Sequence, residues 1–498
     1  MFNPLALPQD LGRLHALASV LVRHGLADLV QRLGIVRVLA RAGHALPATH
    51  ADTPATLTAP VRVRQALEEM GPCFVKLGQL LATRVDLFPP AWIAEFSRLQ
   101  NAVPPVPFTD LRPEMEAALG APLATAFAAI DPEPLAAGSI AQVHRARLHD
   151  GRDVVVKVRR PGIRHDIEAD LRLLRGVARR LERRFPDLAR YHPAGMVAQF
   201  HASLLRELDL AAECHNAERI AAAFADDPRL VVPAVHWPWT NEAMNVQDFV
   251  DGIGVIDLAS LDAAGIDRRG IARDGAQLVL KMLLRDGYFH ADPHPGNVFV
   301  LGDGRLALID FGMVGRLSQA RRAEVVRLLS GLVERDAVQV TEVLLEWTGA
   351  ADVDEDGLAA GIDDFVDRYH GIPLGELDLS RMLLDVVALL QAHRLALPAD
   401  LALMIKVCLT LEGLGRSLDP QFDMAKQARP FLRRAMAREL GPRALARRGV
   451  SALADAARVL SALPGDLRRM RRALRGGGAR VHVRVEELDG FSRQVSHS

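Results

Sequence analysis

Polar side chains recur at short, fixed spacings between residues 290 and 312. Residues 290–297 read His-Ala-Asp-Pro-His-Pro-Gly-Asn, and Asp-Phe-Gly occupies 310–312 after an apolar run. An Asp with an Asn five residues later, and with Asp-Phe-Gly eighteen residues later, is typical of a kinase catalytic loop and metal-binding triplet. Because Mg²⁺ prefers oxygen ligands, Asn297 and Asp310 are predicted to hold it, and Asp292 to orient or deprotonate a phosphate acceptor.

Two simpler interpretations compete with this one. Asp-Phe-Gly alone also occurs in ordinary turns after strands, and it is the neighbouring loop that favours the kinase interpretation. His290 and His294 could indicate a metal site, but isolated histidines more often have structural roles. Neither histidine is therefore predicted to be a ligand.

A single lysine interrupts an apolar, strand-like run upstream, where residues 154–158 read Val-Val-Val-Lys-Val. A buried ammonium is costly without anionic partners, so Lys157 is predicted to hold nucleotide phosphates together with a carboxylate. Glu207 and Glu213 lie about 120° apart on one predicted helix, so only one of them can face the lysine. Glu207 is the predicted partner. A strand-edge lysine that reaches solvent is the alternative, and Asp209 fits a solvated helix face equally well.

An alanine-rich loop precedes this strand. Residues 136–143 read Ala-Ala-Gly-Ser-Ile-Ala-Gln-Val, where a kinase has Gly-x-Gly-x-x-Gly-x-Val. Alanines at glycine positions should make a phosphate-binding loop tighter and less adaptable. An ordinary turn in an alanine-rich chain is the alternative. The residues predicted to contact nucleotide are Ala136, Ala137, Gly138, Ser139, Ile140, Val143 and Lys157, with adenine on the backbone near Asp248 to Val250.

A predicted β-hairpin and several predicted helices must position these side chains. Strand-like runs over 140–148 and 154–158 flank an Asp-Gly turn at 150–151, which is a strong hairpin signal. A further strand is expected over 246–250, and mostly helix from there to about residue 475. Apolar residues recur at helical spacing over 11–42, 163–185 and 196–224.

Length and composition limit the alternatives. A chain of 498 residues with 49% hydrophobic and 24% charged residues is too long for one small module and too apolar for disorder. Lys plus Arg equals Asp plus Glu at 61 each, so charge favours no nucleic-acid partner. The cysteines Cys73, Cys214 and Cys408 lie far apart, which excludes a disulfide framework and fits a reducing compartment. No secretory signal or transmembrane run is recognised, so a cytoplasmic protein is expected.

Together these residues resemble the UbiB family, the aarF-domain kinases, which are protein-kinase-like ATPases. The resemblance includes the family's Lys-x-Gly-Gln signature within Pro-Cys-Phe-Val-Lys-Leu-Gly-Gln at 72–79. It also includes Glu207-Leu208-Asp209 with Glu213 and Asn216, and the segment 290–297. The similarity extends from about residue 15 to about residue 470, and this combination of motifs is highly specific.

The resemblance implies an α+β, two-lobed, protein-kinase-like fold with an N-terminal helical extension and an enlarged helical C-lobe. It implies ATP and Mg²⁺ as cofactors, with the Lys-x-Gly-Gln helices over the place where a protein kinase admits a peptide. Lys76 and Gln79 would then point into the nucleotide site, although periodicity alone would make them solvated helix residues. No Ala-Pro-Glu follows Asp-Phe-Gly, which agrees with a small-molecule or lipid acceptor or with simple ATP hydrolysis.

The resemblance also implies a role in ubiquinone biosynthesis, with polyprenylated quinone precursors and quinone-biosynthesis proteins as partners. Two rival functions stay open. One is a kinase for another lipid or small molecule, and the other is a nucleotide-binding scaffold with little turnover. Against the scaffold, every polar catalytic residue is present, whereas a degenerate scaffold could lose them.

The chain departs from the family pattern at two places. The family loop reads Ala-Ala-Ala-Ser, and Gly138 replaces the third alanine. Many bacterial members end in an apolar helical hairpin that anchors them in the membrane. Here the tail offers Leu467, Met470 and Leu474 surrounded by arginines, a basic amphipathic helix that can lie on anionic lipid. A peripheral position on the cytoplasmic face of the inner membrane is thus expected, and a solvated terminal helix is the alternative.

The predicted organisation has five parts. The first is a set of N-terminal helices with a linker, and the second is a helical extension that carries Lys-x-Gly-Gln. The kinase-like N-lobe and C-lobe and a basic tail follow. Their predicted boundaries are 1–60, 61–120, 121–250, 251–445 and 446–498.

Overall fold

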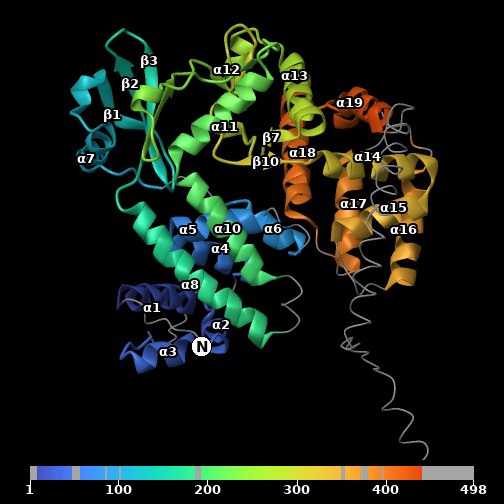
Figure 1. Ribbon diagram of the computed structural model, residues 1–498, viewed down its shortest axis with the longest axis horizontal. Helices are drawn as coiled ribbons and strands as arrows, with labels where there is room; N and C mark the ends of the chain where they lie inside the picture. Colours follow the sequence, from blue (N-terminus) through green and yellow to red (C-terminus); the bar gives the residue numbers. More distant parts are fainter. Residues whose placement is uncertain are drawn as a thin grey trace, which may run out of the picture. The chain divides into compact units, whose positions relative to one another are not determined.

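The computed structural model shows two kinase-like lobes with helices before and after them (Figure 1). It describes residues 8–46, 57–82, 84, 87–99, 103–185, 192–348, 354–370, 372, 379–393, 395 and 397–439. Nearly all of these belong to one compact unit, Met1–Ala435. The predicted basic tail helix lies outside the described residues.

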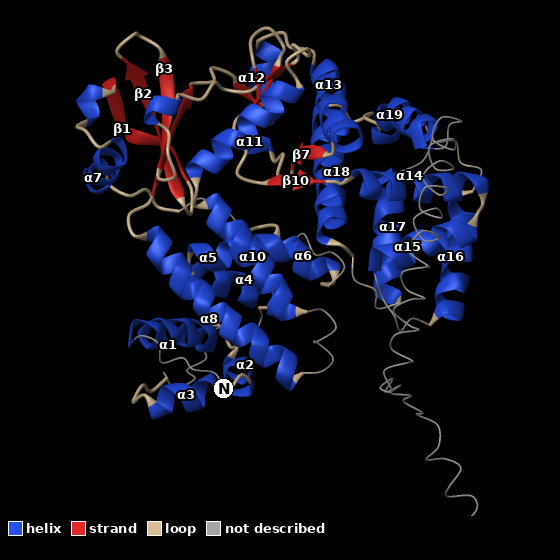
Figure 2. Ribbon diagram, in the orientation of Figure 1, coloured by secondary structure: helices blue, strands red, loops and turns tan. Residues whose placement is uncertain are grey.

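The N-lobe is built on a four-stranded antiparallel sheet with the order β1-β2-β3-β5 (Figure 2). The predicted hairpin is confirmed, because β2 and β3 are joined by a turn in which Gly151 has φ +89°. Val154, Val156 and Val158 alternate onto one face of β3 and are buried with Leu111 and Met115 of α7. The strands are β1 (Phe127–Ala137), β2 (Ala141–Leu148), β3 (Asp153–Arg159) and β5 (Met244–Asp248), and α7 is Phe108–Leu119.

Among the described residues, three long helices lie between β3 and β5 in the sequence. The helix predicted over 163–185 is α8 (Ile163–Arg184). The helix predicted over 196–224 is wrong as a single element, since it divides into α10 (Pro193–Glu207) and α11 (Leu210–Ala223). Asp209 causes the break, because its side chain caps α11 by accepting hydrogen bonds from the N–H groups of Ala211 and Ala212.

The N-terminal extension packs its own core against α8 and α10. Buried apolar residues of α1, α4 and α5 share one cluster with Ile167, Leu171 and Leu204. The helix predicted over 11–42 is interrupted, because Gly25 and Gly34 adopt positive φ and end the first two segments. The helices are α1 (Pro8–Arg23), α2 (Ala27–Arg32), α3 (Ile35–Arg41), α4 (Ala59–Met70), α5 (Pro72–Ala82) and α6 (Pro90–Phe96).

The C-lobe places two small sheets against a large helical core. Strands β7 (Tyr288–His290) and β10 (Val314–Arg316) pair with each other, and the predicted catalytic segment (residues 290–297) begins at the end of β7. A second sheet has the order β4-β9-β8-β6. These last strands are β4 (Leu230–Val231), β6 (Ile253–Gly254), β8 (Val298–Val300) and β9 (Leu306–Leu308). The helices are α12 (Leu258–Ala263), α13 (Arg268–Leu280), α14 (Gln319–Glu334), α15 (Ala337–Thr348), α16 (Glu355–Tyr369), α17 (Leu379–Ala392), α18 (Ala399–Leu418) and α19 (Met424–Glu439).

This arrangement confirms the predicted protein-kinase-like fold and its added helices. Over the part of the chain that the structure describes, no helix is both long enough and apolar enough to span a bilayer.

Candidate functional site

The face of the sheet opposite α7 presents Lys157 to the site. Antiparallel pairing places Val143 of β2, Lys157 of β3 and Asn245 of β5 side by side across three strands. Directly paired residues project from the same face of a sheet, so these three share the face that carries the lysine. The valine-rich opposite face is buried, and this alternation fixes the register that exposes Lys157 to the site.

Lys157 lies between two carboxylates from different elements. Its Nζ donates hydrogen bonds to both oxygens of Glu213 on α11, at 2.9 and 2.8 Å, and lies 3.5 Å from Oδ2 of Asp310. Burial alone would lower the pKa of Lys157, but the charges of Asp310 and Glu213 outweigh burial and raise it. The ammonium is therefore held charged beside two acidic groups, as a phosphate-binding lysine requires.

The predicted pairing of Lys157 with Glu207 is wrong. Glu207 is the last residue of α10 and forms an ion pair with Lys76 of α5. The prediction treated both glutamates as part of one helix, whereas the cap at Asp209 starts a new helix between them. Because of this break, Glu213 reaches β3 and Glu207 reaches the N-terminal extension.

Helix α5 brings Lys76 close to the carboxylates of the site. The charges of Glu207, Asp310 and Asp292 together outweigh the burial of Lys76 and raise its pKa. Its aliphatic neighbours belong to the core that α5 shares with α8 and α10. Gln79, one turn further on, donates a hydrogen bond from Nε2 to the carbonyl of Leu99 at 3.1 Å.

The alanine-rich loop forms the turn of the β1–β2 hairpin. Ala136 and Ala137 end β1, where they pair with Val143 and Gln142. The Gly138 N–H donates to the Ala141 carbonyl at 2.9 Å, and Arg160 Nε donates to the Gly138 carbonyl at 2.8 Å.

The centre of this loop contains an unused polar group. Ile140 and Ser139 are buried, and Ser139 Oγ has no hydrogen-bond partner among the described residues. A buried hydroxyl without a partner costs free energy, so it fits a loop that gains a polar ligand.

The segment predicted to bind adenine follows β5. The Asp248 N–H donates to the Ala234 carbonyl and its carboxylate accepts from His236, while the Phe249 N–H donates to the Asp153 carbonyl. Among the backbone hydrogen bonds of the described residues, the Val250 N–H makes none. Of this segment, Val250 therefore offers the backbone donor that a base could use.

The catalytic segment is shaped by its own backbone hydrogen bonds. The Asp292 N–H donates to Nδ1 of His290, and the His294 N–H donates to the Asp292 carbonyl at 2.7 Å. Asn297 Nδ2 also contacts that carbonyl at 3.4 Å, which leaves the carboxamide Oδ1 as the atom suited to a metal. His290 and His294 thus have structural roles, as the sequence predicts.

Asp310 is held at the start of the Asp-Phe-Gly turn. Its Oδ1 accepts a hydrogen bond from the Gly312 N–H at 2.9 Å, and 42% of its side chain is exposed. Partial burial alone would raise the pKa of Asp310, but Lys157 and the Gly312 N–H hold it well below the ordinary value. The carboxylate therefore stays ionised and accessible, as a magnesium ligand must.

The middle of this turn is fixed from α11. The Phe311 ring is fully buried and lies 5.5 Å from the His290 ring, centroid to centroid. The Phe311 carbonyl accepts from Asn216 Nδ2 at 3.0 Å, and Asn216 Oδ1 accepts from the Tyr288 hydroxyl at 2.6 Å. Helix α11 thus supplies both Glu213 and Asn216, and these tie Lys157 and the Asp-Phe-Gly turn together.

The chain brings together most of the side chains that the sequence predicts. Lys157 of β3 lies beside Asp310 of the Asp-Phe-Gly turn, and the Asn297 side chain contacts the Asp292 carbonyl within the loop. The described residues contain no group of three or more His, Cys, Asp or Glu that could hold a metal by themselves. Asp310 and Asn297 would offer two oxygen ligands, which fits Mg²⁺, because it commonly takes one or two protein ligands and completes its shell with phosphates and water.

One contact was missed by sequence reasoning. Lys406 of α18 donates from Nζ to Oδ1 of Asp292 at 2.8 Å. The signal was available, because Lys406 interrupts a helix that is otherwise apolar near its centre. Burial alone would raise the pKa of Asp292, but the charge and hydrogen bond of Lys406 outweigh burial and lower it. The carboxylate therefore stays ionised.

Comparison with known proteins identifies the family of this chain. Residues 98–344 match the ABC1 atypical kinase-like domain family, and residues 362–423 match the UbiB helical domain family. The proteins named "Probable protein kinase UbiB" from Marinobacter nauticus and Vibrio vulnificus are each 36% identical to this chain. The matches cover 77% and 88% of this chain and 71% and 81% of those proteins. A solved structure of Rv3197 with erythromycin, from Mycobacterium tuberculosis, aligns with a TM-score of 0.48 and 25% identity over 71% of this chain and 90% of that one. The chain belongs to the ABC1/UbiB family of atypical kinase-like proteins.

Proposed function

We propose that this protein is an ATP-dependent atypical kinase or ATPase that uses MgATP and supports the biosynthesis of ubiquinone. The observation that carries the proposal is the position of Lys157 between Glu213 and Asp310, close to the catalytic segment. A lysine held by a helix glutamate beside the Asp of Asp-Phe-Gly is the arrangement that orients nucleotide phosphates in kinases.

Each side chain has a role in this proposal. Lys157 holds the α- and β-phosphates, Asp310 and Asn297 bind Mg²⁺, and Asp292 orients the attacking hydroxyl or water and accepts its proton. When bound, Mg²⁺ neutralises charge on the phosphate oxygens. The hairpin loop with the unpartnered Ser139 hydroxyl covers the phosphates, and the adenine lies on the backbone at Asp248 to Val250.

The N-terminal extension determines which acceptors can enter. Lys76 of α5 is close enough to Asp292 and Asp310 for their charges to raise its pKa, which supports a position of α5 near the catalytic residues. A helix in that position restricts an extended peptide, which favours a small-molecule or lipid acceptor or water. The family resemblance points to a polyprenylated quinone precursor and to quinone-biosynthesis proteins as partners.

Turnover of MgATP by the purified chain tests the chemistry. Wild-type protein should hydrolyse MgATP, and it should do so faster with liposomes and a short-chain phenolic mimic of a quinone precursor. Nucleotide binding without turnover under all of these conditions would favour a scaffold.

Quinone profiling tests the pathway. A strain that lacks this gene should regain ubiquinone when it expresses wild-type protein but not Asp292→Asn at equal abundance. Full rescue by Asp292→Asn would contradict the catalytic role of Asp292. Normal ubiquinone in the deletion strain would contradict a role in ubiquinone biosynthesis.

We also propose a cytoplasmic location with peripheral attachment to the inner membrane through the basic tail. Liposomes that contain anionic lipid should float the full chain but not a form lacking residues 465–498. Equal flotation of both forms would contradict attachment through the tail.

A further inference from the structure

We propose that Lys406 is a positioning residue for the catalytic carboxylate, so that the UbiB helical domain completes the active site. This inference rests on the proposed function, because it assigns Lys406 a role in the same ATP-dependent reaction. Lys406 belongs to the segment that matches the helical domain, whereas Asp292 belongs to the kinase-like domain. The two residues are 114 positions apart and their side chains meet at 2.8 Å.

The catalytic segment contains no Lys or Arg. Residues 290–297 include only His290 and His294 as basic residues, so a permanently charged partner for Asp292 has to come from another element. Helix α18 supplies it. Lys406 donates to Oδ1 of Asp292, which leaves Oδ2 to face an attacking hydroxyl or water.

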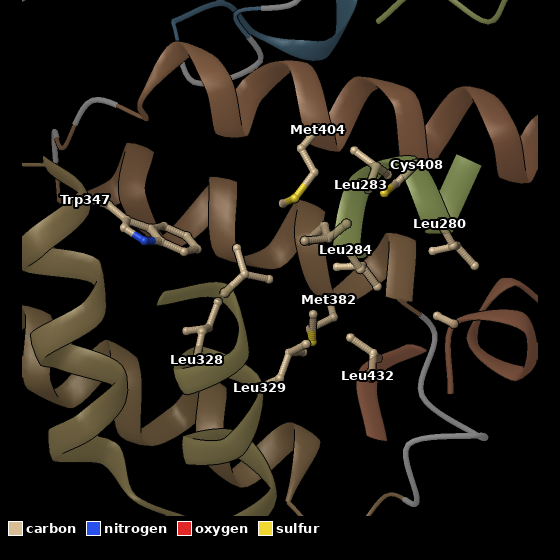
Figure 3. A pocket seen from close by; sticks show the side chains of 13 residues that line it. Leu280, Leu283, Leu284, Leu328, Leu329, Trp347, Met382, Met404, Cys408 and Leu432 are labelled. Atoms are coloured by element: carbon tan, nitrogen blue, oxygen red, sulfur yellow. The ribbon is translucent and has the colours of Figure 1, made fainter. Parts of the chain in front are cut away.

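The packing of α18 explains why this lysine reaches the site. Met404 and Cys408 point from α18 into an apolar cavity that is also lined by Leu283, Leu329 and Trp347 (Figure 3). Residues two positions from either of these lie on the opposite side of a helix. Burial of Met404 and Cys408 therefore directs Lys406 away from the helical core and towards the catalytic loop.

The residue after Asp292 also faces α18. Pro293 lines an apolar cavity together with Leu411 and Leu414 of α18. The loop and the helix therefore border the same apolar space, and the ion pair at Asp292 is the contact that joins them.

The exposure of the pair favours a functional role over a purely structural one. The side chains of Lys406 and Asp292 are 28% and 31% exposed, so the pair is reachable from the site. Partly exposed ion pairs usually contribute less to stability than fully buried ones. The orientation of a catalytic group has a large effect on the reaction rate, because a displacement of about 1 Å can reduce the rate by about a hundredfold.

Steady-state MgATP hydrolysis by the full chain tests the proposal. Lys406→Met removes the charge and keeps the length, Lys406→Gln gives a second neutral variant, and Lys406→Arg keeps the charge. Lys426→Met is the matched control, since Lys426 lies on α19 with 71% of its side chain exposed. Thermal unfolding with and without MgATP reports the folding and the nucleotide binding of each variant.

The proposal predicts that Lys406→Met lowers kcat by at least about tenfold while KM for ATP changes by less than about threefold. Lys406→Arg should retain clearly more activity than Lys406→Met, and Lys426→Met should match wild type. A smaller fall in kcat, an effect mainly on KM, or an arginine variant no better than methionine would overturn it. Failure of both neutral variants to fold would also overturn it, because Lys406 would then be a structural anchor.

These outcomes are distinct from failure of the proposed function. An inactive wild type would overturn the proposed function and this inference together. An active wild type with an equally active Lys406→Met variant would overturn this inference alone.

Discussion

Lys157 of β3 and Glu213 of α11 form a two-point ion pair, with the lysine Nζ at 2.9 and 2.8 Å from the two carboxylate oxygens. Glu213 is 5% exposed, and its burial raises its pKa to about 7 against the opposing effect of Lys157. The pair fixes the strand to the helix that also holds the Phe311 carbonyl through Asn216. A change at Glu213 should therefore alter nucleotide handling as well as the local packing.

Glu213→Gln should reduce kcat/KM for MgATP by about 10- to 100-fold, because Lys157 loses the carboxylate that orients it. Glu218→Gln on the same helix is the matched control, since the Glu218 side chain is 47% exposed and hydrogen-bonds Trp237. Steady-state hydrolysis measures both variants. Wild-type kcat/KM in Glu213→Gln would show that the ion pair does not organise the site.

Asp209→Ala should destabilise the protein by about 1 kcal/mol, because α11 loses the side chain that caps its first turn. Asp209→Asn keeps a capping oxygen and should restore most of that loss. The urea midpoint of unfolding, followed by circular dichroism, measures the difference. If alanine and asparagine lowered the midpoint equally, the cap would not be the cause.

Gly138→Ala should weaken MgATP binding by about two- to tenfold, because a new methyl group crowds the loop that is proposed to cover the phosphates. An added Cβ would lie 3.2 Å from the Ala141 carbonyl oxygen, and Gly138 does not have the positive φ that would strain an alanine. Gly302→Ala is the control, since a Cβ there meets no atom within 4 Å. Titration with a fluorescent ATP analogue should show weaker binding by Gly138→Ala than by Gly302→Ala. Equal affinities of these two variants would refute the role of Gly138.

Asp385→Asn should destabilise the helical C-lobe by about 1 kcal/mol at pH 7. Burial would raise the pKa of Asp385, but hydrogen bonds from Tyr369 and Arg368 outweigh it and lower the pKa. A carboxylate with a lowered pKa stabilises the fold at pH values above its pKa in the unfolded chain, which is about 3.9. This stabilisation is lost as the pH falls through the pKa in the folded protein.

The difference in the free energy of unfolding between wild type and Asp385→Asn should hence stay constant from about pH 7 to pH 5. It should shrink only near pH 4 and below. Urea unfolding of both proteins across this range measures it. A difference that vanished between pH 7 and pH 5 would contradict the assigned pKa direction.

The local motifs of the site could be predicted from the sequence because their spacing fixes their geometry. Asp292, Asn297 and Asp310 lie within one short segment made of a loop, the β8–β9 hairpin and a turn, and an Asp-Gly turn sets the hairpin that carries Lys157. Strand β1 was not predicted from the sequence, and one reason is that it contains Pro132 and Pro134. It tolerates them as an edge strand with register shifts.

Contacts between distant elements could not be predicted in the same way. The choice between Glu207 and Glu213 depends on a helix break at Asp209, which changes the direction of the chain by an amount that periodicity does not report. The contact of Lys406 with Asp292 depends on how α18 packs against the catalytic loop. A lone lysine in an apolar helix indicates a partner but does not identify it.

The central claim is that Lys157, Glu213 and Asp310 form a site for MgATP, and magnesium-dependent hydrolysis by wild type and Asp310→Ala tests it most directly. Asp303→Ala is the matched control, because Asp303 is an exposed aspartate paired with Arg305 in the turn before β9. Wild type and Asp303→Ala should hydrolyse ATP only with Mg²⁺, and Asp310→Ala should lose at least about 99% of that activity. Equal rates in Asp310→Ala and wild type would contradict the claim.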